Sequence, residues 1–557
     1  MGDLIGEVVQ SELYYVARSE FDRIARANAP KPALMSLYAD MTRLNALYMI
    51  ANAGSGHIGS SFSAADIMTH LYVSEMDRDG DVFFSSKGHD APALYSVLIS
   101  RGVLEEDLLH KLRRLNGLPG HPDISVPGLV TNTGSLGMGI SKAKGMIEAA
   151  RAKGAPKRVY VMTGDGELQE GQIWESLVSA ANRKMGELTV IVDHNKIQSD
   201  YSVVRTSDLG ALQAKFEAFG WVCERLDGHD QDALTACFAR LRKEERRPKV
   251  IIADTIKGKG VSFMEGVAID SDVEMFKFHS GAPTADHYQR AVEEIEQRLA
   301  AKLAALHVEP VRVSVAPRPH APPAVAGQVK LFPAYTEALL KLAARAKPEL
   351  IALDADLILD MGLIPFRDAY PDRFIECGIA EQDMVEVRPA AWRSMACCRS
   401  CTFSCFLSTP ERANLQQRQR RRIVYVGGLS GVIPAGPGHS HQSVREISAL
   451  GGIRAWRAMR IEPCCAEEVG PLLEWCAETH DGPSFLRWRQ CRTQRQPGCR
   501  RTTRQPRAKA TPCATAMMAA DRYGRFAGRR RSAGCGGGLE EAGQVIRRDL
   551  AAVAQCH

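Results

Sequence analysis

The sequence predicts an α/β protein with two domains, each built around a parallel sheet, followed by a C-terminal segment without a regular pattern. The chain has 557 residues, more than one hydrophobic core usually organises. Apolar, strand-like runs alternate with amphipathic stretches of helix length from about residue 40 to 265, which is typical of a parallel sheet covered by helices. A stretch rich in Pro, Ala and Val at 307–330 separates this region from a second alternating one.

Composition excludes the membrane class and favours an ordinary globular protein. The chain is 45% hydrophobic and 24% charged. No run of roughly 18 or more apolar residues could span a bilayer. The N-terminal residues include acidic side chains and form no continuous apolar segment, so we predict no secretory signal and a cytoplasmic location.

Charge and cysteine are unevenly distributed along the chain. Residues 488–557 carry 14 Arg and one Lys against four acidic residues, so the rest is mildly acidic although the total is +6. The basic tail lacks interleaved aromatic residues and any nucleic-acid-binding motif, so we expect no nucleic-acid partner. Of the 15 cysteines, 13 follow residue 376. We predict no disulfides, and the single CxxC at Cys398 and Cys401 lacks the second pair of a zinc site.

Three strands and one helix of the first domain can be assigned individually. The helix is expected over 170–184, with Ile173, Trp174, Leu177 and Ala181 on one face. The strands are VYVM (159–162), LTVIVD (188–193) and KVIIADT (249–255).

Polar side chains follow two of these strands where each one ends. Asp165 lies in the Thr-Gly-Asp-Gly after VYVM, and Asn195 lies in the His-Asn-Lys after LTVIVD. The carboxyl edge of a parallel sheet is where ligands bind. A carboxylate, an amide and main-chain carbonyls are hard oxygen donors that suit Mg²⁺ or Ca²⁺. Gly164 and Gly166 permit close backbone approach, and the next helix offers N–H groups to an anion, so we predict a metal-bridged diphosphate site. The alternative for Gly-Asp-Gly alone is a simple turn.

The second domain is expected to contain three strands: ELIALDA (349–355), RFIECG (373–378) and RIVYVGG (422–428). Residues 388–422 and 488–557 interrupt the pattern, because they are rich in Arg, Cys, Gln and Ser with little periodicity. Disorder and translation in a wrong frame both give such composition. The predicted organisation is a first domain at 1–306, a linker at 307–330, a second domain at 331–487 and a degenerate remnant at 488–557.

The motif GDGELQEGQ…NKIQ resembles the thiamine-diphosphate motif of transketolases. The resemblance implies that Asp165, Asn195 and the main-chain carbonyl of Ile197 hold Mg²⁺ or Ca²⁺. It covers nearly the whole first domain, since further stretches match the family in the same order: GSGHIGSS (54–61), SSKGHDAPALYS (85–96), LPGHPD (118–123), NTGSLGMGIS (132–141), IKGKGVSFME (256–265) and KFHSGAP (277–283).

Four histidines and one leucine in these stretches acquire roles from the resemblance. It implies that His89 and His279 lie near the diphosphate, and that His57 and His121 face the substrate hydroxyls and the reacting carbonyl. Leu136 would approach the aminopyrimidine ring, with Ser in place of the family's Pro just before it. Taken singly, each histidine fits a loop or a core equally well.

The resemblance continues into the second domain. RFIECGIAEQDMV (373–385) resembles the segment with the catalytic glutamate, which assigns Glu381 to N1′ of the pyrimidine as an acid/base. Its alternative role is a first-turn glutamate that stabilises a helix dipole. TFSCFLS (402–408) resembles the aromatic cradle of the pyrimidine and points to Phe403 and Phe406; as an alternative, these residues are core. GPGHSHQSVREISAL (436–450) resembles a segment with a substrate-contacting histidine, here His441.

The role of one arginine stays open, and several stretches depart from the family's pattern. Arg367 has two interpretations, a contact to a substrate phosphate or a solvated side chain. A charged family run before His441 is replaced by GGLSGVIPAG (427–436), which carries no charge. Beyond residues 481–488 the resemblance stops. We hypothesise that compensating frameshifts or sequencing errors scrambled 388–422 and 488–557; resequencing that finds an uninterrupted frame with apolar sequence would support this, and an unchanged read would refute it.

The resemblance implies a thiamine-diphosphate-binding fold and ketol transfer. A two-carbon unit would pass from a ketose donor to an aldose acceptor through a carbanion of thiamine diphosphate, with sugars or sugar phosphates as substrates. A homodimer with active sites at the interface between its protomers is expected. Two alternatives stay open: a non-catalytic or damaged relative that binds cofactor or a partner, and a 1-deoxyxylulose-phosphate synthase-like enzyme.

Overall fold

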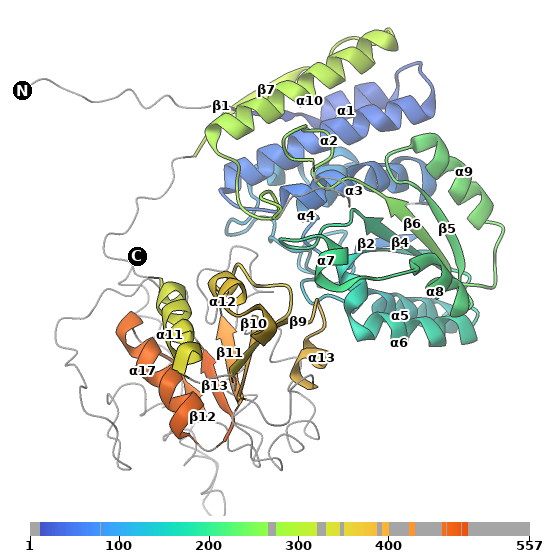
Figure 1. Cartoon of the computed structure of the whole chain (residues 1–557). Helices are drawn as coiled ribbons and strands as arrows, with labels where there is room; N and C mark the ends of the chain where they lie inside the picture. Colours follow the sequence, from blue (N-terminus) through green and yellow to red (C-terminus); the bar gives the residue numbers. More distant parts are fainter. Residues whose placement is uncertain are drawn as a thin grey trace, which may run out of the picture. The chain divides into compact units, whose positions relative to one another are not determined.

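The structure is a computed structural model with two parallel sheets (Figure 1), in agreement with the predicted α/β class. No described helix has both the length and the apolar character needed to cross a membrane. The described residues are 12–77, 79–265, 275–319, 330–345, 350–386, 393–399, 423–428, 459–463, 465–480 and 482–487.

The first sheet has five parallel strands in the order β2-β3-β4-β6-β5. The three strands predicted for this domain are confirmed as β3, β4 and β6. The edge strands β2 and β5 were not assigned individually, and β5 is only partly buried because it has one neighbour. Their bounds are Val82–Ser85 (β2), Val159–Gly164 (β3), Leu188–His194 (β4), Val222–Asp227 (β5) and Lys249–Asp254 (β6).

Helices cover both faces of this sheet, so its central strands are apolar on both sides. Alternate residues of a strand point to opposite faces. Accordingly, Tyr160 and Met162 of β3 join one hydrophobic cluster and Val159 and Val161 join another. The first cluster is formed with α1 (Arg18–Ala25), α2 (Lys31–Ala53), α3 (Ile58–His70), α4 (Ala91–Ser100), α9 (Gln231–Leu241) and α10 (Ala285–Ala305), and the second with α5 (Gly139–Ala152), α6 (Gly171–Asn182) and α8 (Leu212–Ala218).

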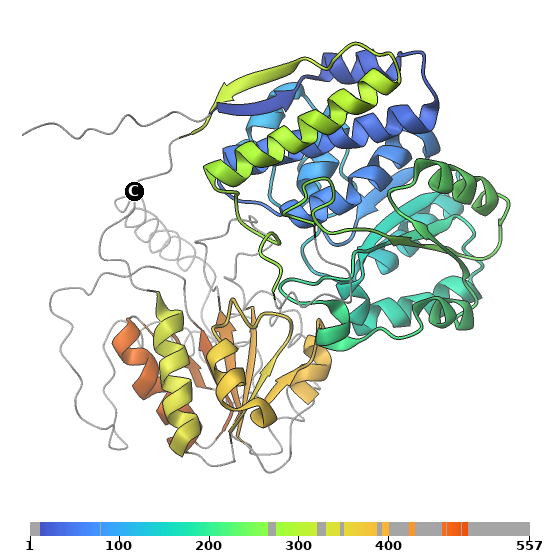
Figure 2. The same cartoon turned by 45° about the horizontal axis from the view of Figure 1, so that its top comes forward.

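A short antiparallel ribbon belongs to the first domain as well. It pairs β1 (Glu12–Val16) with β7 (Val313–Pro317) and lies beside α10 in both views (Figures 1 and 2). β7 falls inside the stretch predicted to be a linker, so the early part of that stretch is ordered secondary structure. The reason is a short alternation, Val-Arg-Val-Ser-Val at 311–315, which packs Val311 and Val313 against the first cluster.

The predicted helix after β3 is α6, preceded by a 3-10 turn at Gly166–Gln169. Ile173 and Leu177 are buried as expected. Trp174 is only partly buried and packs against the edge of the second cluster. Its Nε1 donates a hydrogen bond to the Leu168 carbonyl at 2.9 Å. The helix therefore fixes the turn that carries Asp165 to the core of the domain.

We expect Leu177→Ala to destabilise the first domain by about 2–5 kcal/mol, because it leaves a cavity in the second cluster. Leu177 is fully buried, and its carbonyl accepts the Trp221 indole N–H at 3.1 Å. Denaturant unfolding followed by tryptophan fluorescence would measure the loss. The matched control is Val178→Ala, whose side chain is 47% exposed on the same helix. Equal effects of the two substitutions would contradict this packing.

The second sheet has six parallel strands in the order β12-β13-β11-β10-β8-β9, and the three predicted strands are confirmed as β8, β9 and β11. β10 lies within 388–422, where the sequence pattern predicted no strand. The strands are β8 (Leu350–Asp354), β9 (Phe374–Glu376), β10 (Arg393–Arg399), β11 (Ile423–Gly428), β12 (Met459–Ile461) and β13 (Ser484–Arg487); the helices are α11 (Leu331–Arg345), α12 (Ile364–Ala369), α13 (Glu381–Glu386) and α17 (Ala466–Glu474).

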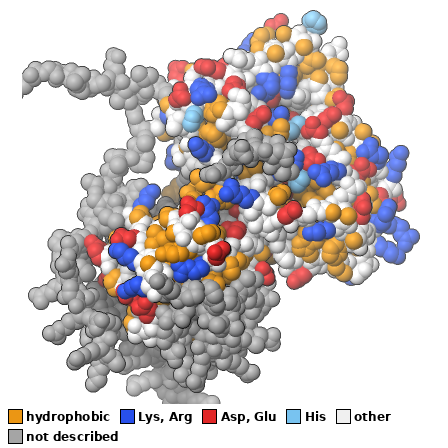
Figure 3. All heavy atoms as spheres, in the orientation of Figure 1, with side chains coloured by type: hydrophobic (Ala, Val, Ile, Leu, Met, Phe, Trp, Pro, Cys, Tyr) orange, Lys and Arg blue, Asp and Glu red, His pale blue; other side chains and the backbone are white. Residues whose placement is uncertain are grey.

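Charged side chains of both signs are interspersed over the described surface in Figure 3. Typical surface ion pairs join Arg183 to Glu148 at 2.6 Å and Arg240 to Glu224 at 2.9 Å. Such exposed pairs contribute at most about 1 kcal/mol each. The fold is therefore held mainly by its hydrophobic clusters, three of which are resolved within the described residues.

Candidate active site

The ends of β3 and β4 bring the predicted metal ligands to one edge of the first sheet. Asp165 follows β3 directly, and Asn195 follows β4 directly. Gly164 pairs with Asp193 in the ladder, so the two strand ends are adjacent. Ile197 lies two residues after Asn195 and is buried.

The oxygen atoms of these residues have the chemistry that a magnesium or calcium ion needs. The buried Asp165 carboxylate accepts the N–H groups of Gly166, at 2.8 Å, and Lys196, and burial raises its pKa. The Asn195 amide oxygen accepts the Ile197 N–H at 3.2 Å. The described residues contain no group of three or more His, Cys, Asp or Glu able to hold a metal ion. A cation here would instead use one carboxylate, one amide and one carbonyl, which fits Mg²⁺ or Ca²⁺.

Glycine at position 166 lets two neighbouring side chains approach the backbone closely. A Cβ atom there would lie 2.9 Å from Cγ of Gln198 and 3.2 Å from a methyl group of Ile379. Any larger residue would therefore push against the side chains of Gln198 and Ile379. At Gly164 the nearest atom would be 3.7 Å away, so the space alone does not demand glycine at that position.

Four predicted histidines meet near this edge, although they come from separate loops. The ring of His57 has its centroid 5.6 Å from His89, 5.7 Å from His121 and 5.3 Å from His279. Burial, followed by the charges of its neighbours, lowers the pKa of His57 and of His89 well below the usual value. Both rings are therefore neutral at pH 7 and can exchange hydrogen bonds with hydroxyl groups.

The hydrogen bonds define which ring nitrogens are available. Nδ1 of His89 lies 2.9 Å from the Lys87 carbonyl, so it carries the proton and Nε2 is an acceptor. Nδ1 of His57 is buried and has no hydrogen-bond partner among the described residues. A buried ring nitrogen without a partner is costly, which points to a ligand at this position.

Two buried lysines lie in the same region and were not singled out from the sequence. Lys87 forms ion pairs with Asp193 and with Asp90, the latter at 3.4 Å. Burial alone would lower the pKa of Lys87, but these carboxylates raise it. Lys257 donates to the carbonyls of Ile197, at 3.1 Å, and Gln198. Both lysines lie inside family-like stretches, SSKGHD and IKGKG, and this position was the only sequence signal for them.

Glu167 connects the turn after β3 with the loop that contains Leu136. Its carboxylate accepts the N–H of Gly137 at 2.8 Å and that of Gly164 at 3.2 Å, and burial raises its pKa. Leu136 is partly buried beside this anchor. Glu167 was not singled out from the sequence, because its contacts arise only in the tertiary fold.

Glu381, at the start of α13, contacts Glu170 of the first domain. Its carboxyl group forms a hydrogen bond with that of Glu170, and burial raises the pKa of both groups, with Glu381 adding to the shift of Glu170. Nearby, the Ile379 N–H donates to Oε1 of Gln169 at 2.8 Å. The pair can therefore hold a proton between two carboxyl groups, and Glu170 was not identified from the sequence.

Arg367 lies apart from the carboxyl pair and contacts Tyr201. One guanidinium N–H donates to the Tyr201 hydroxyl at 2.7 Å, and the group also pairs with the exposed Asp368 at 2.7 Å. Both interpretations of this residue stay open. Phe403, Phe406 and His441 lie outside the described residues.

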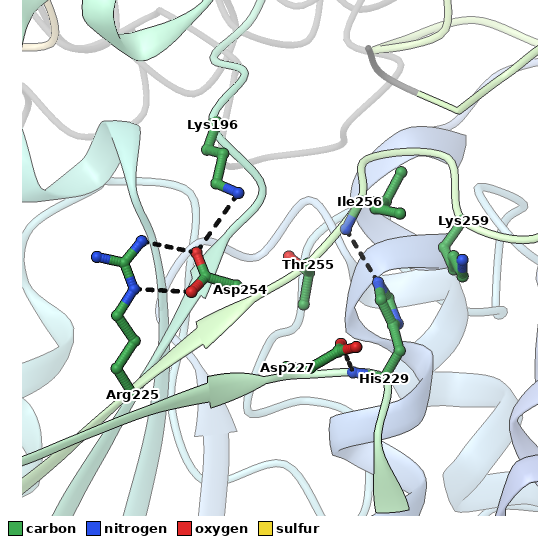
Figure 4. Close-up of a pocket in the computed structure, with 8 residues that line it drawn as sticks. All are labelled: Lys196, Arg225, Asp227, His229, Asp254, Thr255, Ile256 and Lys259. Atoms are coloured by element: carbon green, nitrogen blue, oxygen red, sulfur yellow. Dashed lines mark hydrogen bonds and ion pairs between the residues drawn. The ribbon is translucent and has the colours of Figure 1, made fainter. Parts of the chain in front are cut away.

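A cavity of about 460 Å³ lies at the ends of β5 and β6, next to the loop that carries Lys257 (Figure 4). Within it, Asp254 pairs with Arg225 at 2.7 Å and with Lys196 at 3.5 Å. His229 accepts the Ile256 N–H through Nε2 at 2.9 Å, and its Nδ1 bonds to Asp66 at 2.8 Å. These contacts hold the residue before Lys257 in place.

The chain matches known families over both domains. Residues 35–272 match "Transketolase, thiamine diphosphate binding domain", and residues 328–493 match "Transketolase, pyrimidine binding domain". The chain is 33% identical to one of the subunits of the apulose-4-phosphate transketolase of Phocaeicola vulgatus, over 48% of this chain and 95% of that protein. It is 35% identical to 6-deoxy-6-sulfo-D-fructose transketolase subunit SqwG of Clostridium sp. over 46% of this chain and 95% of that protein.

Human transketolase is similar over a longer stretch. It is 32% identical over 430 residues, which are 74% of this chain and 67% of the human protein. Asp165 and Asn195 lie in the part that matches the diphosphate-binding domain, and Glu381 lies in the part that matches the pyrimidine-binding domain. The chain belongs to the transketolase family.

Proposed function

We propose that this protein transfers a two-carbon ketol unit from a ketose donor to an aldose acceptor, using thiamine diphosphate and a divalent cation. The observation that carries the proposal is the cluster of three oxygen donors, Asp165, Asn195 and Ile197, beside four convergent histidines in a transketolase-family chain. When bound, thiamine diphosphate supplies an electron sink for cleavage and formation of the carbon–carbon bond.

The first domain supplies the groups that hold the charged end of the cofactor. Asp165, Asn195 and the Ile197 carbonyl are proposed to bind Mg²⁺ or Ca²⁺. His89 and His279 are proposed to face the diphosphate. The turn at Gly164–Gly166 and the N–H groups at the start of the helix that follows are proposed to face it as well. The absence of a Cβ at Gly166 lets the side chains of Gln198 and Ile379 pack against this turn.

Glu381 is proposed to exchange a proton with N1′ of the pyrimidine ring. The hydrogen bond to Glu170 supports this role, because two adjacent carboxyl groups in a buried setting favour the protonated form. A carboxyl group that keeps a proton near pH 7 can give it up and take it back during the reaction. Leu136 is proposed to support the same ring from the first domain.

His57 and His121 are proposed to act on the sugar. His57 is neutral and offers one unpartnered ring nitrogen, which supports contact with a hydroxyl or a carbonyl oxygen. His121 is buried beside it. Neutral imidazoles can position hydroxyl groups and move protons without adding a fixed charge to the pocket.

The substrates are proposed to be sugars or sugar phosphates. The names of two relatives specify an apulose phosphate and a sulfonated deoxyfructose, which each carry an anionic group. Phe403, Phe406 and His441 are proposed to complete the pyrimidine and substrate contacts. We propose a homodimer with active sites at the interface, which light scattering of the purified chain would test, and a cytoplasmic location.

Calorimetric titration of thiamine diphosphate, with and without Mg²⁺, tests the proposed function on the full chain. Magnesium-dependent binding near one site per chain, followed by turnover of a ketose donor, is the expected result. Cofactor binding without turnover of any ketose–aldose pair would favour the non-catalytic alternative. A folded protein that binds no cofactor would contradict the proposed function and leave a relative that binds a partner as the alternative.

A further inference from the structure

Lys257 is a buried cation that lacks an ion-pair partner among the described residues. Its side chain extends from the loop after β6 and is 2% exposed. The ammonium donates to the carbonyls of Ile197, at 3.1 Å, and Gln198, and to Nδ1 of His279 at 3.0 Å. These three acceptors use all three of its N–H groups. No described carboxylate lies within ion-pair distance of it, and burial lowers its pKa to about 8.

Lys257 differs from Lys87, the other buried lysine of this region, in having no carboxylate within ion-pair distance among the described residues. Lys87 is equally buried, but it forms ion pairs with Asp193 and Asp90. Burying an ammonium without such a pair is costly. The field of Asp165 partly offsets this cost for Lys257, since the carboxylate attracts it without contact.

Asp165 shows the complementary feature. Its carboxylate is 2% exposed and accepts two backbone N–H groups, and no described cation is within ion-pair distance. The Ile197 carbonyl, the third proposed metal ligand, is occupied by the Lys257 ammonium. A divalent cation bound to the same carbonyl oxygen would lie about 2.0–2.6 Å from it. Two cations that share one oxygen in a buried site repel each other strongly.

We propose that the Lys257 ammonium, by holding the Ile197 carbonyl, weakens the binding of a divalent cation to Asp165, Asn195 and Ile197 unless the diphosphate binds with it. This inference rests on the metal site of the proposed function. The negative charge of the diphosphate would offset the repulsion between the metal ion and the ammonium. A metal ion alone would be repelled by the ammonium that shares this carbonyl and would bind weakly. Lys257 would thereby couple cation binding to cofactor binding.

The test measures Mn²⁺ binding to the full chain without thiamine diphosphate, by electron paramagnetic resonance of the free ion. We expect Lys257→Met to bind Mn²⁺ about tenfold or more tightly than the unmodified chain, because a like charge is removed. Lys257→Gln should show the same gain, and Lys257→Arg, which keeps the charge, should not. The matched control is Lys259→Met, since Lys259 is one-third exposed on the same loop and 3.7 Å from Glu265.

A second substitution locates the bound ion. Adding Asp165→Asn to Lys257→Met should remove the gain. Folded Lys257→Met and Lys257→Gln variants that bind Mn²⁺ no more tightly than the unmodified chain would overturn the inference, as would an equal gain in Lys259→Met. If one neutral variant fails to fold by circular dichroism, the other decides.

The result is separable from the proposed function. If the unmodified chain binds thiamine diphosphate with Mg²⁺ but the neutral variants gain no Mn²⁺ affinity, the inference fails and the function stands. If the neutral variants gain affinity through Asp165 but the unmodified chain binds no cofactor, the function fails and the inference about the cation site stands.

Discussion

Asp165→Asn should abolish magnesium-dependent binding of thiamine diphosphate. The substitution removes the only charged ligand of the proposed cation site and leaves the amide and carbonyl oxygens of Asn195 and Ile197. Loss of a buried charged partner typically costs about 3–5 kcal/mol, which is more than a hundredfold in Kd. Calorimetric titration of the cofactor with Mg²⁺ would measure the loss. The asparagine keeps one acceptor oxygen for the N–H groups of Gly166 and Lys196, so the turn should persist.

Asp227→Asn is the matched control for this change. Asp227 ends the edge strand β5 of the same sheet and accepts the His229 N–H at 2.9 Å, but it lies at the cavity of Figure 4 and outside the cation site. We expect unchanged cofactor affinity for this variant. Retained affinity in Asp165→Asn would refute the metal site.

Glu381→Gln should lower the rate of ketol transfer by about 10²–10⁴-fold while cofactor binding is retained. Glutamine can still form a hydrogen bond with Glu170, but it cannot release or accept a proton. Single-turnover kinetics with a ketose donor would measure the rate, and calorimetry would measure the binding.

The control for Glu381 is Asp383→Asn on the same helix. Asp383 is exposed, and its neutralisation should leave both rate and binding unchanged. A Glu381→Gln variant that is as active as the unmodified chain would remove the acid/base role. Loss of cofactor binding in this variant would mean that Glu381 has a structural role instead.

The strand-end geometry of the first domain was predictable from the sequence, whereas the contacts of its lysines were not. Asp165 and Asn195 follow apolar strands, and parallel strands that are neighbours end at the same edge. No local pattern indicates that Lys257 reaches the backbone of Ile197, because two separate loops must first fold together. Glu170 was also missed, since its significance depends on Glu381, which is more than 200 residues away.

Three of the strands that were not assigned from the sequence lack the apolar pattern of a buried strand. β5 reads Val-Cys-Glu-Arg-Leu-Asp, because an edge strand with partly exposed faces tolerates charge. β7 is a short alternation embedded in a proline-rich stretch. β10 reads Arg-Ser-Met-Ala-Cys-Cys-Arg, and its place in the sheet is evident only from its pairing with β8 and β11.

The position of β10 also constrains how the second domain can be synthesised and folded. A nascent chain that ends before residue 393 contains only β8 and β9 of the second sheet's described strands, and a two-stranded ladder is at best marginally stable. β13, the last described strand to be translated, lies between β12 and β11. The sheet therefore closes late, through contacts distant in sequence, and such topologies fold slowly and expose unpaired edges meanwhile. Expression yield should depend on chaperone supply during translation of this half, whereas the first sheet is complete by residue 254.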